Sequence, residues 1–478
     1  MMDAIRRNTI PLIIATALFM ENLDATVLAT SLPAIAKDLG ASPIHLKLAV
    51  TTYLLALAVF IPASGWVADR YGTLKVFRAA MAVFALGSIG CAMSEGLASL
   101  VAARVLQGVG GAMMMPVGRL VILRAVPKTE IVSAMAWLTV PALLGPVLGP
   151  PLGGFITTYF DWRWIFWINI PVALFGMWLV TRYIPDIREP ANQRFDLFGF
   201  LLVGPGLAMF LTGVTIAGLD LLPRLLVAAL IVAGALLLGL YVRHALRTDA
   251  PPIDLRLLAL PTFRASLLGG MLFRIGLGAG PFLLPLLFQL GFGLTPFQSG
   301  LLIFATGVGA IFMKTQASRI LRAYGFRRVL VWNAVIAGAF SLVPAFYTPA
   351  TPYLLIAGLF FAGGLSRSLQ FTSINSVGYA DVPPEKLSRA TSFGAVLQEL
   401  SGSIGVSIAA LGLEGMQAWL GEDGITLGLF PPVFLLVAAI SAASALVFMR
   451  MPRDSGRELL FRAPDPRRDA PETGEGHL

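Results

Sequence analysis

Apolar side chains follow one another along this chain in long runs, and short polar segments separate the runs. A helix that crosses a bilayer needs about 20 predominantly apolar residues. Runs of that order lie near residues 9–33, 46–68, 76–94, 97–123, 131–158, 163–181, 197–217, 222–243, 265–292, 296–315, 329–347, 351–379, 390–413 and 427–449. The pattern predicts an all-α polytopic membrane protein with fourteen transmembrane helices and no large soluble domain.

The composition agrees with this pattern. Of the 478 residues, 57% are apolar and 13% are charged, whereas soluble domains carry roughly 25% charged residues. The first run is longer than the apolar core of a secretory signal peptide and contains Glu21 and Asp24, so we interpret it as an uncleaved first span. The tail over residues 451–478 is polar and proline-rich, which is typical of a disordered cytoplasmic segment, and it predicts no function.

Lysine and arginine divide the loops into two kinds. One set of loops carries only Lys37, Lys47, Arg163 and Arg224. The other set, which includes the N-terminus, holds Arg6, Arg7, Arg70, Lys75, Arg78, Arg119, Arg124, Lys128, Arg188, Arg194, Arg243, Arg247, Arg256, Arg264, Arg319, Arg322, Arg327, Arg328, Lys386 and Arg389. Because basic loops stay in the cytoplasm, we expect a multi-pass protein of the cell inner (plasma) membrane with both termini cytoplasmic. The net charge of +9 then predicts anionic membrane lipids as partners, and no nucleic acid.

Cysteine and histidine are scarce. The single cysteine, Cys91, lies in an apolar run, and His45, His244 and His477 lie outside the runs. This excludes a disulfide framework, a cysteine or histidine metal site and a buried histidine proton relay. We expect Cys91 to be a small core residue.

The loop between the second and third runs carries Gly65, Asp69, Arg70, Gly72 and Lys75. Glycine permits close helix approach and a tight turn, and an acid at a helix end can accept charged hydrogen bonds. An ordinary basic loop would not require this spacing. The loop resembles the signature loop of the major facilitator superfamily, which implies a role in gating at the cytoplasmic surface.

A partial copy of this loop lies between the tenth and eleventh runs. The segment from Arg322 to Arg328 keeps the Tyr-Gly pair and the last basic residue. We therefore expect the major facilitator fold with two six-helix halves and two inserted central helices. The predicted parts are an N-terminal half over 1–184, the inserted helices and their linkers over 185–262, a C-terminal half over 263–450, and the tail. Parallel repeats of this kind place a substrate site between the halves, near the bilayer midplane.

One face of the fourth run carries Arg104, Gln107, Gly108 and Gly111, spaced three and four residues apart. This face resembles the Arg-x-x-Gln-Gly element of the superfamily. An arginine deep in a span is costly unless it faces a carboxylate or a water-filled space. Snorkelling of Arg104 to the outer headgroups is the alternative.

The fifth run contains Gly145, Pro146, Gly149, Pro150 and Gly153, followed by Gly154. Glycines four residues apart let another helix pack closely, and proline bends a helix because it lacks a backbone donor. The segment is similar to the antiporter motif of the superfamily, which importers generally lack. Helix packing alone is the simpler interpretation.

The first run carries Glu21 and Asp24 within a Leu-Asp-Ala-Thr sequence that ends in Leu32-Pro33. It resembles an element of the fourteen-helix drug:H⁺ antiporters, although Thr30-Ser31 replaces the usual Asn-x-Ala. Segments 162–171 and 194–199 resemble further signatures of that family. A carboxylate at this depth could change protonation as its surroundings open and close, so Asp24, Glu21 and Arg104 are candidates for proton coupling. A permanent pair with Arg104 is the alternative.

Arg274, Arg367 and Glu399 are ionisable residues well inside the runs of the C-terminal half. Intramembrane charges usually mark substrate or ion pathways. Arg274 could instead snorkel, and Arg367 could pair with Glu399. We take Glu399, Arg367, Gln370, Arg274 and Gln107 as candidate substrate contacts, and Glu399 also as a candidate for proton coupling.

The resemblance implies a proton-coupled antiporter that exports drugs or other small amphipathic compounds by alternating access. No nucleotide-binding loop occurs, so we expect the proton gradient to supply the energy and no cofactor. We also expect a monomer without enzymatic activity. The alternatives are an exporter of a specific anionic metabolite or metal chelate and, less favoured by the fifth run, a proton-coupled importer.

Overall fold

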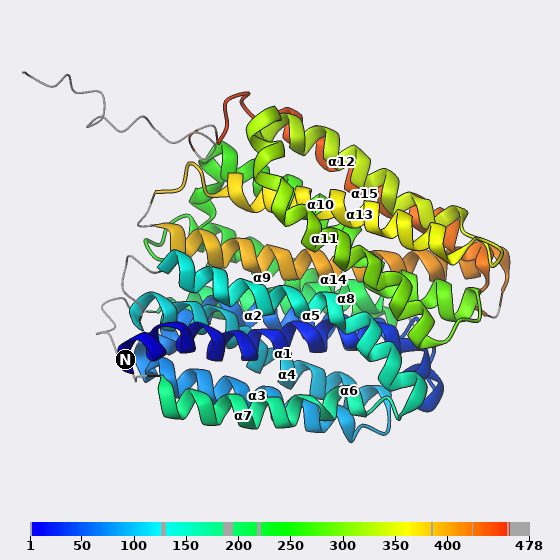
Figure 1. Cartoon of the computed structure of the whole chain (residues 1–478), viewed down its shortest axis with the longest axis horizontal. Coiled ribbons are helices and arrows are strands. Elements are labelled where there is room, and N and C mark those ends of the chain that lie inside the picture. The colour runs from blue at the N-terminus through cyan, green and yellow to red at the C-terminus, as the bar shows by residue number, and fades with distance from the viewer. Residues whose placement is uncertain are drawn as a thin grey trace, which may run out of the picture.

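The protein is a bundle of long helices, and no strand occurs in the residues described (Figure 1). The computed structural model describes residues 2–125, 131–184, 195–217, 221–383, 386–422, 424–456 and 458. The helices are α1 (Met2–Asp38), α2 (Lys47–Tyr71), α3 (Thr73–Ala92), α4 (Leu97–Ala125), α5 (Ile131–Tyr159), α6 (Trp164–Trp167), α7 (Asn169–Tyr183), α8 (Leu197–Ile216), α9 (Arg224–Ala245), α10 (Pro261–Leu286), α11 (Pro296–Tyr324), α12 (Phe326–Leu342), α13 (Tyr353–Gly378), α14 (Leu387–Leu420) and α15 (Phe430–Met449). The all-α prediction is confirmed.

Thirteen helical segments among the described residues are long and apolar enough to cross a membrane. Helix α5 is a further helix of 29 residues, and it packs against α1 and α11. Each predicted run therefore corresponds to one long helical segment. The sixth run is divided into α6 and α7 at Ile168. Helix α11 extends nine residues beyond the predicted end of its run, at 315, so Lys314 lies well before the end of the helix.

Helix α1 begins and α15 ends at the same end of the bundle, on the left in Figure 1. We call this the basic end, because the α2–α3 turn with Arg70 and Lys75 lies there. We call the other the far end. The predicted tail lies mostly outside the described residues, and so do Lys128, Arg188 and Arg194.

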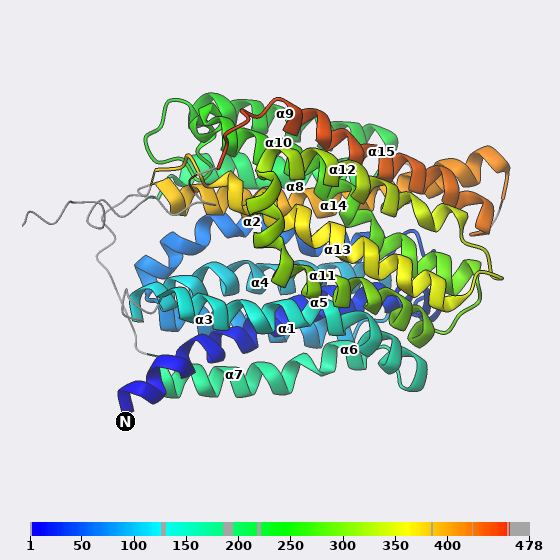
Figure 2. The same ribbon diagram turned by 45° about the horizontal axis from the view of Figure 1, so that its top comes forward.

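Two sets of helices follow the same packing pattern. In the N-terminal set, α1 packs on α5 and α7, while α2 and α3 pack on α4. In the C-terminal set, α10 packs on α14 and α15, while α11 and α12 pack on α13. Helices α8 and α9 pack on each other, and α8 contacts both α2 and α14 (Figure 2). The part boundaries at 184, 262 and 450 stay a prediction.

The two Tyr-Gly loops have the same geometry. Gly72 alone separates α2 from α3, with φ 92° and ψ 138°. Gly325 alone separates α11 from α12, with φ 75° and ψ 158°. A positive φ is readily adopted only by glycine, which explains why this residue is retained while the acid of the first loop is replaced by Arg322. The tight turn expected at Gly72 is present.

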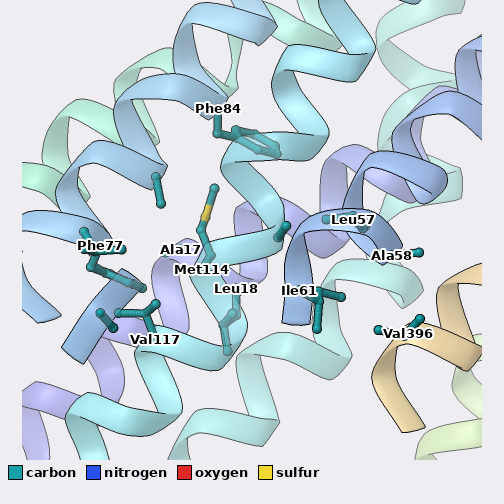
Figure 3. Packing of buried hydrophobic residues seen from close by; sticks show 14 of the residues in the cluster. Ala17, Leu18, Leu57, Ala58, Ile61, Phe77, Phe84, Met114, Val117 and Val396 are labelled. Carbon is teal, nitrogen blue, oxygen red and sulfur yellow. The ribbon is translucent and has the colours of Figure 1, made fainter. Parts of the chain in front are cut away.

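Apolar packing joins the two sets. Near the basic end, Phe77, Met114 and Val117 pack with α1, and Val396 of α14 lies beside Ile61 of α2 (Figure 3). At the far end, one hydrophobic cluster takes residues from α1, α10 and α14 together, among them Leu32, Leu286 and Leu413. The space between the sets is thus bounded by side chains from both.

Candidate functional site: a buried charge cluster between the two helix sets

Asp24 of α1 and Arg104 of α4 form a buried ion pair. Nη1 of Arg104 lies 2.5 Å from Oδ2 of Asp24, and the side chains are each 1% exposed. Gln107 and Asn169 each donate a side-chain N–H to Oδ1 of Asp24 at 2.8 Å. The Nε of Arg104 donates to the carbonyl oxygen of Ala49 at 3.0 Å. Both oxygens of Asp24 are occupied, so the structure favours the paired interpretation of this carboxylate and excludes snorkelling of Arg104 in this conformation.

The face of α4 predicted from sequence accounts for this arrangement. Arg104 and Gln107 point to α1, and Gly108 lets α4 approach α2, because a Cβ there would lie 2.6 Å from that of Ala56. The ring of Tyr53 lies 4.0 Å below the Arg104 guanidinium. Cys91 is buried beside Gln107, with its Sγ 3.7 Å from the amide oxygen, so its predicted place in the core is confirmed.

Glu21 lies one turn before Asp24 on α1 and differs from it in its partners. Its Oε2 is buried without a hydrogen-bond partner among the described residues, and so is the hydroxyl of Tyr53. Glu21 interacts electrostatically with Glu399 and Asp24, which repel it, and with Arg119, which attracts it. The site therefore contains one compensated acid and one uncompensated acid on the same helix.

Glu399 is the third acid of the site and comes from the C-terminal set. It is partly buried on α14, and the positive charge of Arg274 on α10 attracts it. Arg274 is 6% exposed. It donates to Oδ1 of Asn375 at 2.7 Å, and its guanidinium lies 5.3 Å from the ring of Phe371. Snorkelling of Arg274 is therefore wrong for this conformation, since its neighbours on α13 hold it inside the bundle.

Arg367 does not pair with Glu399. It is partly buried on α13, and among the described residues no hydrogen bond or ion pair to it is found. The physical reason is that α13 packs on α11 and α12, whereas α14 packs on α10 and α2. Gln370 is fully buried and turned toward α12, where it accepts from Asn333 and donates to the Leu330 carbonyl, both at 3.0 Å. The structure thus places Gln370 in the packing of α13 on α12. Its hydrogen bonds do not reach the charge cluster, by which we mean Asp24, Arg104, Glu21, Glu399 and Arg274.

The predicted gating loop lies at the basic end. Arg70 and Lys75 are exposed, and Asp69 in the last turn of α2 is half-buried. The environment of Gly65 differs from the expectation, because a Cβ added to this residue would meet no atom within 4 Å. Close helix approach at Gly65 is therefore wrong for this conformation, since no described residue of a neighbouring helix comes within 4 Å of that position.

The glycines of the fifth run make close contacts with both helix sets. A Cβ at Gly145 would lie 2.9 Å from Asn22, and one at Gly149 would overlap Thr26 of α1. Gly153 faces Val27, while Gly154 faces the backbone of Pro296 in α11. Pro146 is exposed, and Pro150 is buried against Gly300 of α11. Helix α5 thus connects α1 of one set to α11 of the other.

The sequence profile of the Major Facilitator Superfamily matches residues 14–406 of the chain. The chain belongs to the major facilitator superfamily.

Relatives in this superfamily are similar over nearly the whole length. A protein of Salmonella dublin named "Putative multidrug resistance protein MdtD" is 39% identical over 454 residues, which cover 94% of this chain and 96% of the relative. The protein of the same name from Citrobacter koseri is 38% identical over the same shares. This transporter is thus similar to proteins named for multidrug resistance.

Solved structures show the same fold at low sequence identity. A D-xylose-proton symporter superposes with a TM-score of 0.68 at 14% identity, covering 94% of this chain and 98% of the symporter. The human organic anion transporter MFSD10 gives 0.62 at 16% identity, over 92% and 99%. A bacterial homologue of the lysosomal transporter Spinster, in an inward-facing and occupied conformation, gives 0.66 at 13%, over 93% and 96%. The likeness confirms the predicted major facilitator fold.

Some residues of the transporter site were not predicted from the sequence. Asn169 was noted only as part of the segment 162–171, and Lys314 lay at the very end of a run. Lys314 donates to the Thr372 hydroxyl at 2.8 Å. Lys47 was counted as a loop charge, yet its side chain is fully buried against Glu414. A count of loop charges cannot show that the Lys47 side chain is buried. Asn169 could have been found from the sequence, because it lies in the segment 162–171 that resembles a signature of the same family as the Asp24 segment.

The environments of Gly149 and Gly65 predict a loss of stability on substitution by alanine at the first and little effect at the second. We expect Gly149→Ala to lower the apparent melting temperature of the purified transporter and its folded yield, because the added Cβ would overlap Thr26, and overpacking typically costs about 1–3 kcal/mol. Gly65→Ala adds the same methyl group to a helix, but there the methyl group meets open space. We expect it to leave the melting temperature nearly unchanged. Size-exclusion chromatography after heating measures both, and equal melting temperatures would refute the packing role of Gly149.

Proposed function

We propose that this transporter is a proton-coupled antiporter that exports drugs or other small amphipathic compounds by alternating access. The observation that carries the proposal is the pair of acids Glu21 and Glu399. They come from opposite helix sets, they lie close enough to repel each other, and Oε2 of Glu21 has no hydrogen-bond partner among the described residues.

Two nearby acids in a span are costly when both are ionised, because burial removes their hydration and their charges repel. Binding of a proton or of a cationic group on the substrate relieves this cost. Since either one suffices, proton and substrate compete for the same acids, and that competition is the basis of exchange. Asp24, held by Arg104, supplies a fixed negative charge beside Glu21 and has no free oxygen with which to exchange.

Several observations support the proposed direction of transport and the proposed orientation of the protein in the membrane. The packing of α5 on both α1 and α11 fits the antiporter motif read from the sequence. The relatives named for multidrug resistance support export of drugs. The excess of lysine and arginine in one set of loops supports placing the basic end and both termini in the cytoplasm of a bacterial cell.

Reconstituted vesicles test the proposal. We expect an imposed pH gradient, acidic on the side of the far end, to drive tetraphenylphosphonium from the basic end to the far end against its concentration gradient. Empty vesicles, and vesicles treated with a proton ionophore, are the controls. Transport that needs substrate and proton to move in the same direction would contradict antiport.

Export of an anion is the second candidate function, and three basic residues of the C-terminal set favour it. Arg274, Lys314 and Arg367 lie on α10, α11 and α13, and none of them makes an ion pair with a described residue. An anionic metabolite or metal chelate would compensate such charges. The acids Glu21 and Glu399 favour the first candidate.

Neutral variants of Glu399 and Arg367 separate the two candidates. We expect Glu399→Gln to lower transport of tetraphenylphosphonium about tenfold and to leave a neutral dye unaffected, because only the cation loses a charge interaction. The matched variant Arg367→Gln should leave both cation and neutral dye unaffected. Transport assays in vesicles with the cation, the neutral dye and citrate measure this. Selective loss of citrate transport in Arg367→Gln, with normal cation transport in Glu399→Gln, would favour anion export.

A further inference from the structure

The far end of the bundle is closed by contacts between the two helix sets, and one of these contacts is ionic. Nζ of Lys47, the first residue of α2, lies 3.1 Å from Oε1 of Glu414 on α14. The Lys47 side chain is 0% exposed and that of Glu414 is 20% exposed. Among the ion pairs of the described residues, this is the one that joins the N-terminal set to the C-terminal set.

The surroundings of this pair are apolar. Ile44 and Leu46 on one side and Leu413 on the other belong to the hydrophobic cluster of the far end. Oε2 of Glu414 is buried without a hydrogen-bond partner among the described residues. Each charge therefore depends on the other for compensation while the far end is closed.

Within the part of the chain that the structure describes, the other polar contacts that join the sets at this end are neutral. The amide of Gln289 donates to the Thr30 carbonyl at 2.8 Å, and the backbone N–H of Phe297 donates to the Thr158 hydroxyl at 3.0 Å. Water can replace such bonds at little cost when the sets separate. A buried charge behaves differently, because removal of its partner leaves it uncompensated in the closed state only.

We propose that Lys47 and Glu414 form a latch that holds the far end closed and that separates each time the far end opens to release substrate. The latch rests on the alternating access of the proposed function and requires neither proton coupling nor a particular substrate. Once the sets move apart, water solvates both charges, so separating the intact pair costs little free energy. Loss of one member raises the free energy of the closed state and leaves the open state unchanged.

The latch predicts a change in conformation that can be measured without transport. Spin labels on Glu95→Cys, between α3 and α4, and Gly424→Cys, between α14 and α15, report the distance across the far end. Both positions are exposed, and the native Cys91 is buried. We expect Glu414→Gln to shift the ratio of closed to open distances by about tenfold or more toward open, because Lys47 keeps its charge without a partner.

Related variants make the test specific. Lys47→Met should shift the same ratio in the same direction but less, since the remaining carboxyl group can take up a proton and become neutral. The charge-swapped variant Lys47→Glu/Glu414→Lys should restore the distances of the unmodified protein. Asp38→Asn is the matched control, because the Asp38–Arg163 pair lies at the same end within the N-terminal set and is 46% and 29% exposed. It should leave the distances unchanged.

Unchanged distances in both single variants would overturn the latch, and so would an equal shift in Asp38→Asn. If Glu414→Gln yields no folded protein, Lys47→Met and the charge-swapped variant provide the test. A shift of the distances in Lys47→Met that is absent from the charge-swapped variant supports the latch. Unchanged distances in Lys47→Met overturn it. Failure of proton coupling would leave these distances unaffected, so the latch and the proposed function fail separately.

Discussion

Asp24→Asn is expected to lower the stability of the folded transporter by about 3–5 kcal/mol, because it leaves the buried Arg104 guanidinium without a counter-charge. Arg104 is 1% exposed and has no other acid within ion-pair distance among the described residues. An asparagine can still accept from Gln107 or Asn169, but it cannot compensate the positive charge. The apparent melting temperature in detergent, measured by size-exclusion chromatography after heating, checks this expectation.

Two further variants show whether the charge is responsible. Asp24→Asn/Arg104→Gln removes both buried charges and should recover most of the lost melting temperature. Asp38→Asn removes an exposed acid from the same helix, where an ion pair contributes at most about 1 kcal/mol, and should have little effect. A melting temperature of Asp24→Asn equal to that of the unmodified protein would mean that the Asp24–Arg104 pair does not hold α1 to α4.

Glu21→Gln is expected to have the opposite profile, with normal stability and a loss of proton coupling. Oε2 of Glu21 has no hydrogen-bond partner among the described residues, so an amide there breaks no known contact and removes the repulsion with Glu399. The variant can no longer exchange a proton at this position. We expect transport driven by a pH gradient in vesicles to fall by about tenfold or more, equivalent to about 1.4 kcal/mol, while downhill exchange of tetraphenylphosphonium continues.

Downhill exchange is the control for folding and insertion of the Glu21 variant. Glu422→Gln neutralises an acid near the far end that is not part of the charge cluster, and it should couple normally. If Glu21→Gln responds to the pH gradient as the unmodified protein does, Glu21 carries no coupled proton.

The helices and much of the charge cluster follow from the sequence for physical reasons. Long apolar runs have one stable form in lipid, because every backbone N–H and C=O must be paired within the segment. Arg104 and Gln107 lie three residues apart, so one helix face brings both to the same partner. A pair of Asp24 with Arg104 was one of the two alternatives for this acid, and the structure shows that contact.

Other features depend on which helices become neighbours, and the sequence does not contain that information in local form. Arg367 and Glu399 lie on consecutive helices, yet α13 and α14 pack on different partners. Lys47 and Glu414 are 367 positions apart, and only the packing of α2 on α14 brings them together. The difference between the compensated Asp24 and the uncompensated Glu21 likewise arises from Arg104, which forms an ion pair with only one of the two acids.

Substrate-induced proton release from the purified protein tests the central claim most directly. Tetraphenylphosphonium is added to the unmodified transporter in weakly buffered detergent solution, and the pH is recorded with an indicator dye. If proton and substrate compete at Glu21 and Glu399, binding should acidify the solution, and Glu21→Gln/Glu399→Gln should bind the probe more weakly and release no protons. Saturating binding to the unmodified protein with no release at any pH at which it is folded would contradict proton-coupled antiport at this site.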